Sequence, residues 1–252
     1  MPSILLLTND FGPRAGGIET FIIGLLERMP KGEVIVYTSR QSGSESFDKK
    51  WLDNFGVKVI RDASKILLPS PRVIRAVRKV IKQSKIEKVW FGAAAPLAIS
   101  ARFLRVGNVK KIVALSHGHE VWWSKVFPFN LAMKEIARSV DVLTFLGDYT
   151  GSVIKKNFKG RAKLVKIAPG IDINHFKPVR DLSKISEVRS ELKIGSEPLI
   201  LSVGRLVHRK GQDKLITAMP KILIKRPDAK LLFIGQGPRK AKLDSLIAKY
   251  GI

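Results

Sequence analysis

Short runs of apolar, often β-branched residues alternate with amphipathic stretches along most of this 252-residue chain. The runs that we expect to be strands are Ser3–Thr8, Val34–Ser39, Val57–Arg61, Lys88–Phe91, Lys111–Ser116, Val140–Phe145 and Lys163–Ile167. The helical patterns lie at Ile18–Met29, Pro71–Ser84, Pro96–Val106, Phe129–Arg138 and Tyr149–Phe158. Such alternation predicts βαβ units, and therefore an α/β fold in which helices cover both faces of a parallel sheet. The strands are continuously apolar, which is typical of strands buried on both faces.

A loop rich in turn residues, Ala168–Pro178, predicts a boundary between two domains. We expect an N-terminal Rossmann-like domain over residues 1–170, a linker over 171–197 with a short helix near Ile185–Leu192, and a second domain over 198–252. The second domain repeats the pattern with strands Leu199–Val203 and Lys230–Ile234 and helices Gln212–Lys225 and Arg239–Lys249. Two parallel strands leave a sheet with unpaired edges and half-covered faces. We therefore expect an incomplete second domain and a chain shortened from a longer one.

The charge balance predicts an anionic partner. Lys and Arg number 46 against 21 Asp and Glu, which gives a formal net charge of +25. Such a chain is expected to associate with nucleic acid, acidic lipid or phosphorylated ligands. A generally basic proteome, or selection for solubility, would produce the same excess.

Composition and the N-terminal residues indicate a cytoplasmic protein. The chain has no cysteine, which excludes disulfides, thiolate zinc sites and a cysteine nucleophile, and fits a reducing compartment. The first ten residues, "MPSILLLTND", lack the basic region and cleavage site of a signal peptide. No apolar stretch approaches the ~20 residues that cross a bilayer.

A glycine pair, Gly16–Gly17, precedes the first predicted helix, whose first turn contains Glu19. Unpaired N–H groups and the helix dipole attract phosphate to a helix N-terminus, and glycine lets the backbone come close to a ligand. A simple tight turn would explain the pair equally well. The stretch lacks the GxGxxG pattern, which disfavours a dinucleotide-dependent oxidoreductase.

The segment "LSHGHEVWW", Leu115–Trp123, follows the fifth predicted strand and so lies at the carboxyl end of the sheet, where ligands bind. On an extended chain His117 and His119 would point the same way and could bind a metal, but no third ligand is evident nearby. We favour a catalytic or substrate-orienting role. Two ordinary surface histidines are the alternative.

The segment "SVGRLVHRKGQ", Ser202–Gln212, places Arg205 and Lys210 around a loop that leads into a helix. Two cations and a helix N-terminus together form a receptor for a diphosphate. Hydrogen bonds to charged groups contribute ~1.5–3 kcal/mol each. The loop "GQGP", Gly235–Pro238, after the next strand predicts a second close approach of the backbone to a ligand.

The helix predicted from Pro71 combines an apolar stripe with a strongly basic remainder. Its basic residues include Arg72, Arg75, Arg78, Lys79 and Lys82, and no acidic residue follows before Glu87. Each basic residue near an anionic bilayer is worth ~1 kcal/mol, so we expect this helix to face a membrane and to bind it by charge rather than by deep insertion. An ordinary solvated helix is the alternative.

These pieces together resemble the retaining glycosyltransferases of family 4. The motifs that carry the resemblance are "GGIETF", "HGHE", "PGIDINHF", "SVGRLVHRKGQD" and "LLFIGQGP", which span nearly the whole chain. "LTNDFGPRAGGIE", "VWFGAAAPLA" and "SHGHEVWW" are similar to the subgroup that transfers mannose from GDP-mannose to phosphatidylinositol mannosides. The resemblance implies a GT-B fold, in which two Rossmann-like domains face a cleft.

The resemblance also implies roles for particular residues. Gly16 and Gly17 would approach the donor phosphate, and Arg205 and Lys210 would bind the donor diphosphate. His117 would be the active-site histidine near the transferred sugar, with Asp10 and His119 in the vicinity of the sugar or acceptor. The implied reaction is a front-face transfer with retention, in which cations replace the metal that other transferases use. We therefore expect no metal and no cofactor beyond the donor, and a peripheral location on the inner face of the plasma membrane.

One family motif lies outside the sequence. The two glutamates, eight residues apart, that contact donor sugar and ribose would fall beyond residue 252, so independent activity is an open question at this stage. Three alternatives remain: a nucleic-acid-binding domain, for which no RNA-binding, zinc-finger or helix-turn-helix pattern is present; a non-catalytic protein that binds anionic lipid; and a family 4 transferase with another donor or acceptor. We expect no nucleic acid partner, and the oligomeric state stays open.

Overall fold

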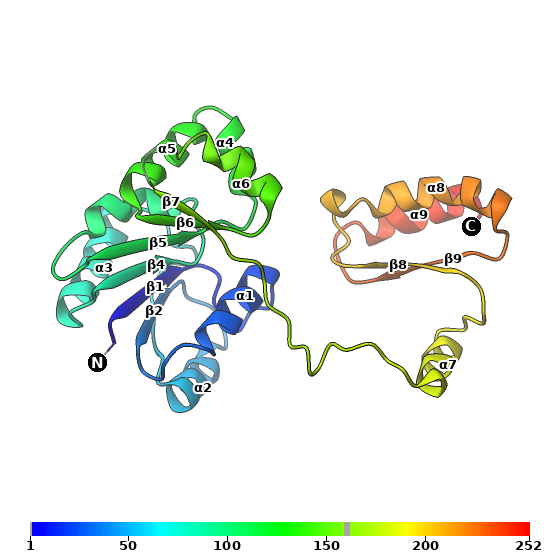
Figure 1. Ribbon diagram of the computed structural model, residues 1–252, viewed down its shortest axis with the longest axis horizontal. Coiled ribbons are helices and arrows are strands. Elements are labelled where there is room, and N and C mark those ends of the chain that lie inside the picture. The colour runs from blue at the N-terminus through cyan, green and yellow to red at the C-terminus, as the bar shows by residue number, and fades with distance from the viewer. Residues whose placement is uncertain (1, 159–161) are drawn as a thin grey trace. The chain divides into compact units, whose positions relative to one another are not determined.

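A computed structural model describes residues 2–158 and 162–252 of the chain. It divides into two compact units, Met1–Ile171 and Asp172–Ile252, and each is described by itself (Figure 1). Helix α7, Leu182–Glu191, lies within the second unit and overlaps the helix predicted at Ile185–Leu192.

The first unit is built on a seven-stranded parallel sheet in the order β3-β2-β1-β4-β5-β6-β7. Its strands are β1 Ile4–Thr8, β2 Val34–Thr38, β3 Lys58–Arg61, β4 Lys88–Phe91, β5 Lys111–Leu115, β6 Val142–Phe145 and β7 Lys163–Lys166. The predicted α/β class is confirmed, and the seven predicted strands are present with ends shifted by at most two residues. The strand order reverses at β1 and β4, so the loops that follow these two strands flank the switch point where parallel sheets bind ligands.

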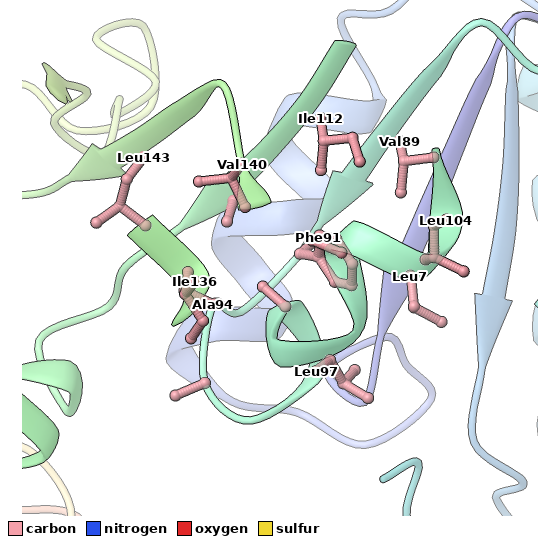
Figure 2. Close-up of a cluster of buried hydrophobic side chains, with 14 of the residues drawn as sticks. Leu7, Val89, Phe91, Ala94, Leu97, Leu104, Ile112, Ile136, Val140 and Leu143 are labelled. Atoms are coloured by element: carbon pink, nitrogen blue, oxygen red, sulfur yellow. The ribbon is translucent and has the colours of Figure 1, made fainter. Parts of the chain in front are cut away.

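Helices cover both faces of this sheet (Figure 1). They are α1 Gly17–Leu26, α2 Ser44–Phe55, α3 Pro71–Gln83, the 3-10 helix η1 Leu97–Leu104, α4 Glu120–Lys125, α5 Phe129–Ser139 and α6 Asp148–Lys155. One core joins alternate strand residues to α3, η1, α5 and α6, and Figure 2 shows part of it around Phe91. The opposite face buries Leu6 and Trp90 against Ile22 of α1 and Trp51 of α2.

Two helices of the first unit were not predicted, and a third differs in type. Helix α2 is mostly polar and buries only Ser44 and Trp51, so it has little apolar periodicity. Helix α4 has only six residues. The stretch predicted as a helix at Pro96–Val106 forms the 3-10 helix η1, whose small side chains Ala98 and Ala101 are fully buried.

The second unit contains a two-stranded parallel sheet, β8 Leu199–Val203 with β9 Lys230–Ile234. Its other elements are the short 3-10 helix η2 His208–Lys210, helix α8 Gln212–Lys225 and helix α9 Lys240–Tyr250. Leu206, Ile216 and Leu243 form a small core between the two helices and the sheet. Within the described residues no further strand pairs with β8 or β9, so each has one unpaired edge.

No helix among residues 2–158 and 162–252 combines the length and the apolar character that a bilayer span requires.

Candidate functional site

The first unit gathers polar side chains where β1, β4 and β5 end. Asp10 follows β1, Gly92 follows β4, and His117 follows β5. Since the three strands are neighbours and parallel, their carboxyl ends share one edge of the sheet. A fully buried Thr8 Oγ1 accepts a hydrogen bond from the backbone N–H of Asp10 at 2.9 Å, which fixes the turn after β1.

Both predicted histidines contact the loop that follows β4. His117 Nε2 lies 2.7 Å from the carbonyl oxygen of Gly92, and His119 Nε2 lies 3.2 Å from that of Ala95. A carbonyl oxygen can only accept, so Nε2 of His117 carries a proton in this arrangement and Nδ1 remains for other partners. The segment is not extended as predicted, because Gly118 has φ of +96° and His119 is helical. The two rings nevertheless reach the same loop.

Glu120 stabilises the loop that carries His117 and His119, which we call the histidine loop. Its carboxylate is fully buried, and Oε2 accepts hydrogen bonds from Ser116 Oγ at 3.0 Å and from the backbone N–H of His117 at 3.2 Å. The other oxygen, Oε1, makes no hydrogen bond within the described residues but lies 3.3 Å from His119 Nε2. Glu120 was not predicted to be a functional residue, although it is part of the motif "HGHE". The signal available was an acidic residue at the first position of a helix, next to two histidines.

Asp10 lies in a cluster of charges with Arg14 and Glu19. Burial raises the pKa of the Asp10 carboxyl, and the nearby Glu19 carboxylate raises it further, whereas Arg14, His117 and His119 lower it. Arg14 Nη2 lies 2.7 Å from Glu19 Oε1 and 3.6 Å from Asp10 Oδ1, so one guanidinium links both acids. The two histidines are therefore close enough to Asp10 to influence the pKa of its carboxyl.

The two glycines before α1 have different surroundings. A Cβ on Gly16 would lie 2.2 Å from Glu19 Oε2, so the space over Gly16 is filled by the chain's own carboxylate. A Cβ on Gly17 would meet nothing within 4 Å. Helix α1 begins at Gly17 without a side-chain cap. Of the two glycines, Gly17 thus has open space for a ligand.

In the second unit, the loops after β8 and β9 pack directly on each other. A Cβ on Gly235 would lie 2.0 Å from the carbonyl oxygen of Gly204, and one on Gly237 would lie 2.4 Å from that of Leu206. Gly204 and Gly235 also have positive φ, a conformation that favours glycine. The backbone N–H of Leu206 donates to the carbonyl oxygen of Gln236 at 2.9 Å. These glycines are therefore required by packing between the two loops.

Arg205 and Lys210 lie on the first of these loops with exposed side chains. The side chain of Lys210 passes close to Gly204, since a Cβ added to Gly204 would lie 3.8 Å from Lys210 Cε. The buried Gln212 donates from Nε2 to the carbonyl oxygen of Arg205 at 3.2 Å and anchors the loop to the start of α8. No ion pair or side-chain hydrogen bond engages either cation among the described residues. Both charges remain available for an anion.

The basic residues of α3 are not equivalent. Arg72 makes two hydrogen bonds to the buried Asp62, at 2.7 and 3.0 Å, so its charge is already paired within the chain. Ser70 caps the helix by accepting from the backbone N–H of Val73. The side chains of Arg75, Lys79 and Lys82 are exposed and that of Arg78 is half-buried, while Val73, Val77 and Ile81 pack on the sheet. The apolar stripe of α3 therefore belongs to the core, and the other cations lie outside it.

Among residues 2–158 and 162–252, no group of three His, Asp or Glu side chains is arranged to hold a metal ion.

A Rossmann-like parallel sheet in the first unit and a glycine-rich βαβ unit in the second are the elements expected of a GT-B glycosyltransferase. The model for "Glycosyltransferase Family 4" matches residues 15–175, and the model for "Glycosyl transferases group 1" matches residues 183–252. The chain belongs to glycosyltransferase family 4.

Its curated relatives include the "GDP-mannose-dependent alpha-(1-6)-phosphatidylinositol monomannoside mannosyltransferase" of Mycolicibacterium smegmatis. The two are 36% identical over 99% of this chain and 65% of the relative. The Corynebacterium glutamicum protein named for the monoacylated form of that acceptor is also 36% identical, over 96% of this chain and 63% of the relative. This chain thus spans about two thirds of the length of these proteins.

Solved structures share the fold. Anabaena HepE, crystallised with UDP, matches all of this chain and 66% of its own with a TM-score of 0.76 at 17% identity. A glycosyltransferase from Rickettsia africae matches 99% of this chain and 66% of its own with a TM-score of 0.73 at 20% identity. The predicted GT-B class is therefore confirmed.

Proposed function

We propose that this chain takes part in the transfer of mannose from GDP-mannose to a phosphatidylinositol mannoside glycolipid, with retention at the anomeric carbon. The observation that carries the proposal is the 36% identity over nearly the whole chain to relatives that bear this activity in their names. The free cations Arg205 and Lys210 and the open backbone at Gly17 suit a donor diphosphate. The acceptor would be met at the cytoplasmic face of the plasma membrane.

Each residue has a proposed role in one displacement. An acceptor hydroxyl oxygen attacks the anomeric carbon on the face from which the diphosphate leaves, and its proton passes to the departing phosphate oxygen. Arg205, Lys210 and the N-terminus of α8 stabilise the charge that develops on the diphosphate. His117, held through Nε2 by Gly92, keeps Nδ1 to accept from a sugar hydroxyl. Asp10 and His119 orient the sugar or the acceptor. The reaction needs no metal.

The direct test is transfer of labelled mannose from GDP-mannose to detergent-solubilised phosphatidylinositol mannoside by the purified chain. We expect a product whose anomeric configuration, read by NMR, equals that of the donor, and turnover that survives a chelator. UDP-glucose and GDP alone serve as control nucleotides. Transfer from another sugar nucleotide would move the assignment to a different family 4 specificity. Lipid binding without any transfer would favour the non-catalytic alternative.

Arg205→Ala and Lys210→Ala test the diphosphate site. Each is expected to weaken GDP-mannose binding by about tenfold to a hundredfold, because a charged hydrogen bond contributes ~1.5–3 kcal/mol. Calorimetric titration measures this, and circular dichroism checks that the fold persists. Arg209→Ala, on the same loop, is the matched control and should bind as the parent chain does. Unchanged affinity in both site variants would reject the assignment.

A further inference from the structure

Four large apolar side chains are exposed together around α4, α5 and α6 of the first unit. We call them the interfacial patch: Trp122, 53% exposed; Phe127, 74%; Leu131, 51%; and Tyr149, 68%. Trp122 belongs to α4, Phe127 precedes α5, Leu131 is on α5 and Tyr149 is in the first turn of α6. Helix α4 packs against both α5 and α6, so these elements form one continuous surface (Figure 1).

The patch is held in place by contacts beneath it. The Trp122 ring lies against Phe129 with centroids 4.7 Å apart, and Trp123 contacts the same ring at 4.9 Å. Lys125 Nζ lies 3.3 Å from the hydroxyl oxygen of Tyr149, which joins α4 to α6. Trp122 and Tyr149 are therefore held in place by neighbouring side chains, although both are exposed.

The helices of the patch also carry exposed cations, and Glu135 and Asp148 on the same helices are already paired. Lys125 and Lys134 are exposed beside the aromatic residues, and Lys155 and Lys156 lie at the end of α6. Nearby, Glu135 contacts Arg102 at 3.4 Å, and Asp148 contacts Lys166 at 2.8 Å. The surface thus combines apolar rings with positive charge that no acid on these helices neutralises.

Exposed tryptophan, tyrosine and phenylalanine flanked by lysine are the composition of protein surfaces that enter the headgroup region of a bilayer. Helix α5 lies on the same face of the sheet as the basic helix α3.

We propose that the interfacial patch inserts into the headgroup and upper acyl region of a bilayer that contains anionic lipid. This adds an apolar anchor to the charge-based attachment expected of α3, and it rests on the proposed use of a glycolipid acceptor. The patch adjoins the histidine loop, since a Cβ on Gly118 would lie 3.9 Å from Thr150 Oγ1 of α6. Insertion here brings lipid headgroups next to the edge of the sheet that carries His117.

The test is flotation of the full chain with vesicles of phosphatidylglycerol and phosphatidylcholine, at low and at high salt. The variant Trp122→Ser/Phe127→Ser/Leu131→Ser should lower the partition coefficient by about tenfold or more, since it removes the apolar surface that would leave water on insertion. The loss should persist at high salt, where screening removes attachment by charge alone. The matched control, Leu52→Ser/Ile66→Ser/Ile224→Ser, changes three equally exposed apolar residues elsewhere and should partition as the parent does.

Tryptophan fluorescence gives a second readout that needs only mild changes. Trp51 and Trp90 are buried, so a blue shift on adding vesicles reports on the Trp122–Trp123 pair, and Trp122→Phe should remove most of it. Phe127→Ser alone, at the most exposed position, keeps the test available if the triple variant does not fold. An unchanged partition coefficient and emission would overturn the proposal. A concentration-dependent blue shift without vesicles would also overturn it, because it would indicate a second copy of the chain on the patch.

Failure of this proposal is separable from failure of the proposed function. If the parent chain transfers mannose to a detergent-solubilised acceptor and the patch variants still bind vesicles normally, the proposal of membrane insertion fails and the transferase assignment stands. Vesicle binding that depends on the patch, in a chain that transfers no mannose, would overturn the transferase assignment alone.

Discussion

Glu120 shows how one buried residue can position a site without touching a ligand. Its carboxylate accepts from Ser116 and from the backbone of His117, and its other oxygen faces His119. The loop that carries both histidines is thereby tied to the end of β5. A substitution of Glu120 should therefore change the conformation of this loop, and it should affect catalysis only by displacing the two histidines.

We expect Glu120→Ala to lower the free energy of unfolding by about 2 kcal/mol or more, because it leaves the buried hydroxyl of Ser116 and the N–H of His117 without an acceptor. Glu120→Gln keeps an amide oxygen in the same place and should cost less than about 1 kcal/mol. Urea unfolding followed by circular dichroism measures both. Equal losses in the two variants would contradict the hydrogen-bonding role.

At this scale the sequence identifies residue types but not their surroundings. The motifs single out His117, Arg205 and Lys210, and among residues 2–158 and 162–252 no side chain pairs with either of the two cations. The pairing of Arg72 with Asp62 could not be predicted, because the two residues are joined only when β3 and α3 are placed in space. The position of the Glu19 carboxylate over Gly16 could not be predicted either, because it depends on the side-chain rotamer of Glu19 and on its ion pair with Arg14.

Between elements, the junction of β3 and α3 is held by a network centred on Asp62. Tyr37 of β2 donates to Asp62 Oδ2 at 2.5 Å, Arg72 of α3 donates to both oxygens, and the backbone N–H of Ser64 donates at 2.8 Å. The Arg72 guanidinium, with the Tyr37 and Ser64 donors, holds the pKa of the Asp62 carboxyl far below its ordinary value despite burial. Burial, with the Asp62 hydrogen bond, raises the pKa of Tyr37.

The sign of the resulting pH dependence follows from proton counts. Between the depressed folded pKa of Asp62 and its ordinary value near ~3.9, the unfolded chain binds more protons, so stability rises with pH across that window. The contribution is fully present above the ordinary value and is lost as the pH falls. Asp62→Asn should therefore destabilise the chain at neutral pH and have less effect at strongly acidic pH, as measured by thermal unfolding. A pH-independent difference would contradict this assignment.

Helix α3 tests the electrostatic part of membrane binding. Arg75→Glu/Arg78→Glu/Lys79→Glu reverses three charges outside the core and should lower low-salt binding to anionic vesicles by tenfold or more, given ~1 kcal/mol per basic residue near the surface. The matched control is Lys31→Glu/Lys49→Glu/Lys50→Glu, which reverses the same number of charges near α2. Vesicle co-sedimentation compares them. Equal losses would show that net charge matters and that α3 has no special role.

Over the whole molecule, the two units are joined by a fully exposed stretch. Every residue from Gly170 to Arg180 is exposed, and its hydrogen bonds are local ones around Asp172. Exposed segments with few tertiary contacts are the preferred sites of proteolysis. Trypsin does not cut the bond between Lys177 and Pro178, so we expect limited digestion to cut first after Arg180 and to release the first unit as a stable fragment, identified by mass spectrometry. Initial cleavage inside α3 or α5 would contradict this.

Fold class and element order were predictable at this scale, because seven apolar strands separated by amphipathic helices leave few alternatives. Two features of the first unit were not. Helix α2 is mostly polar and packs through Trp51 with the partly buried Phe47 and Phe55, and η1 takes a tighter 3-10 form where Ala98 and Ala101 meet the sheet. Both features depend on tertiary packing and therefore cannot be predicted from the hydrophobic periodicity of the sequence.

Each of the strands β8 and β9 has one edge that no described strand pairs with, and these edges affect the tendency of the protein to aggregate. An open edge can accept a strand from a neighbouring molecule, and Leu201 and Val203 would add apolar side chains to such a pairing. The formal charge of +25 works against that encounter, since like-charged molecules repel at long range. Ionic strength therefore acts in two opposing ways: dilute buffer keeps copies apart, and concentrated salt shortens the repulsion and leaves the edges free to aggregate.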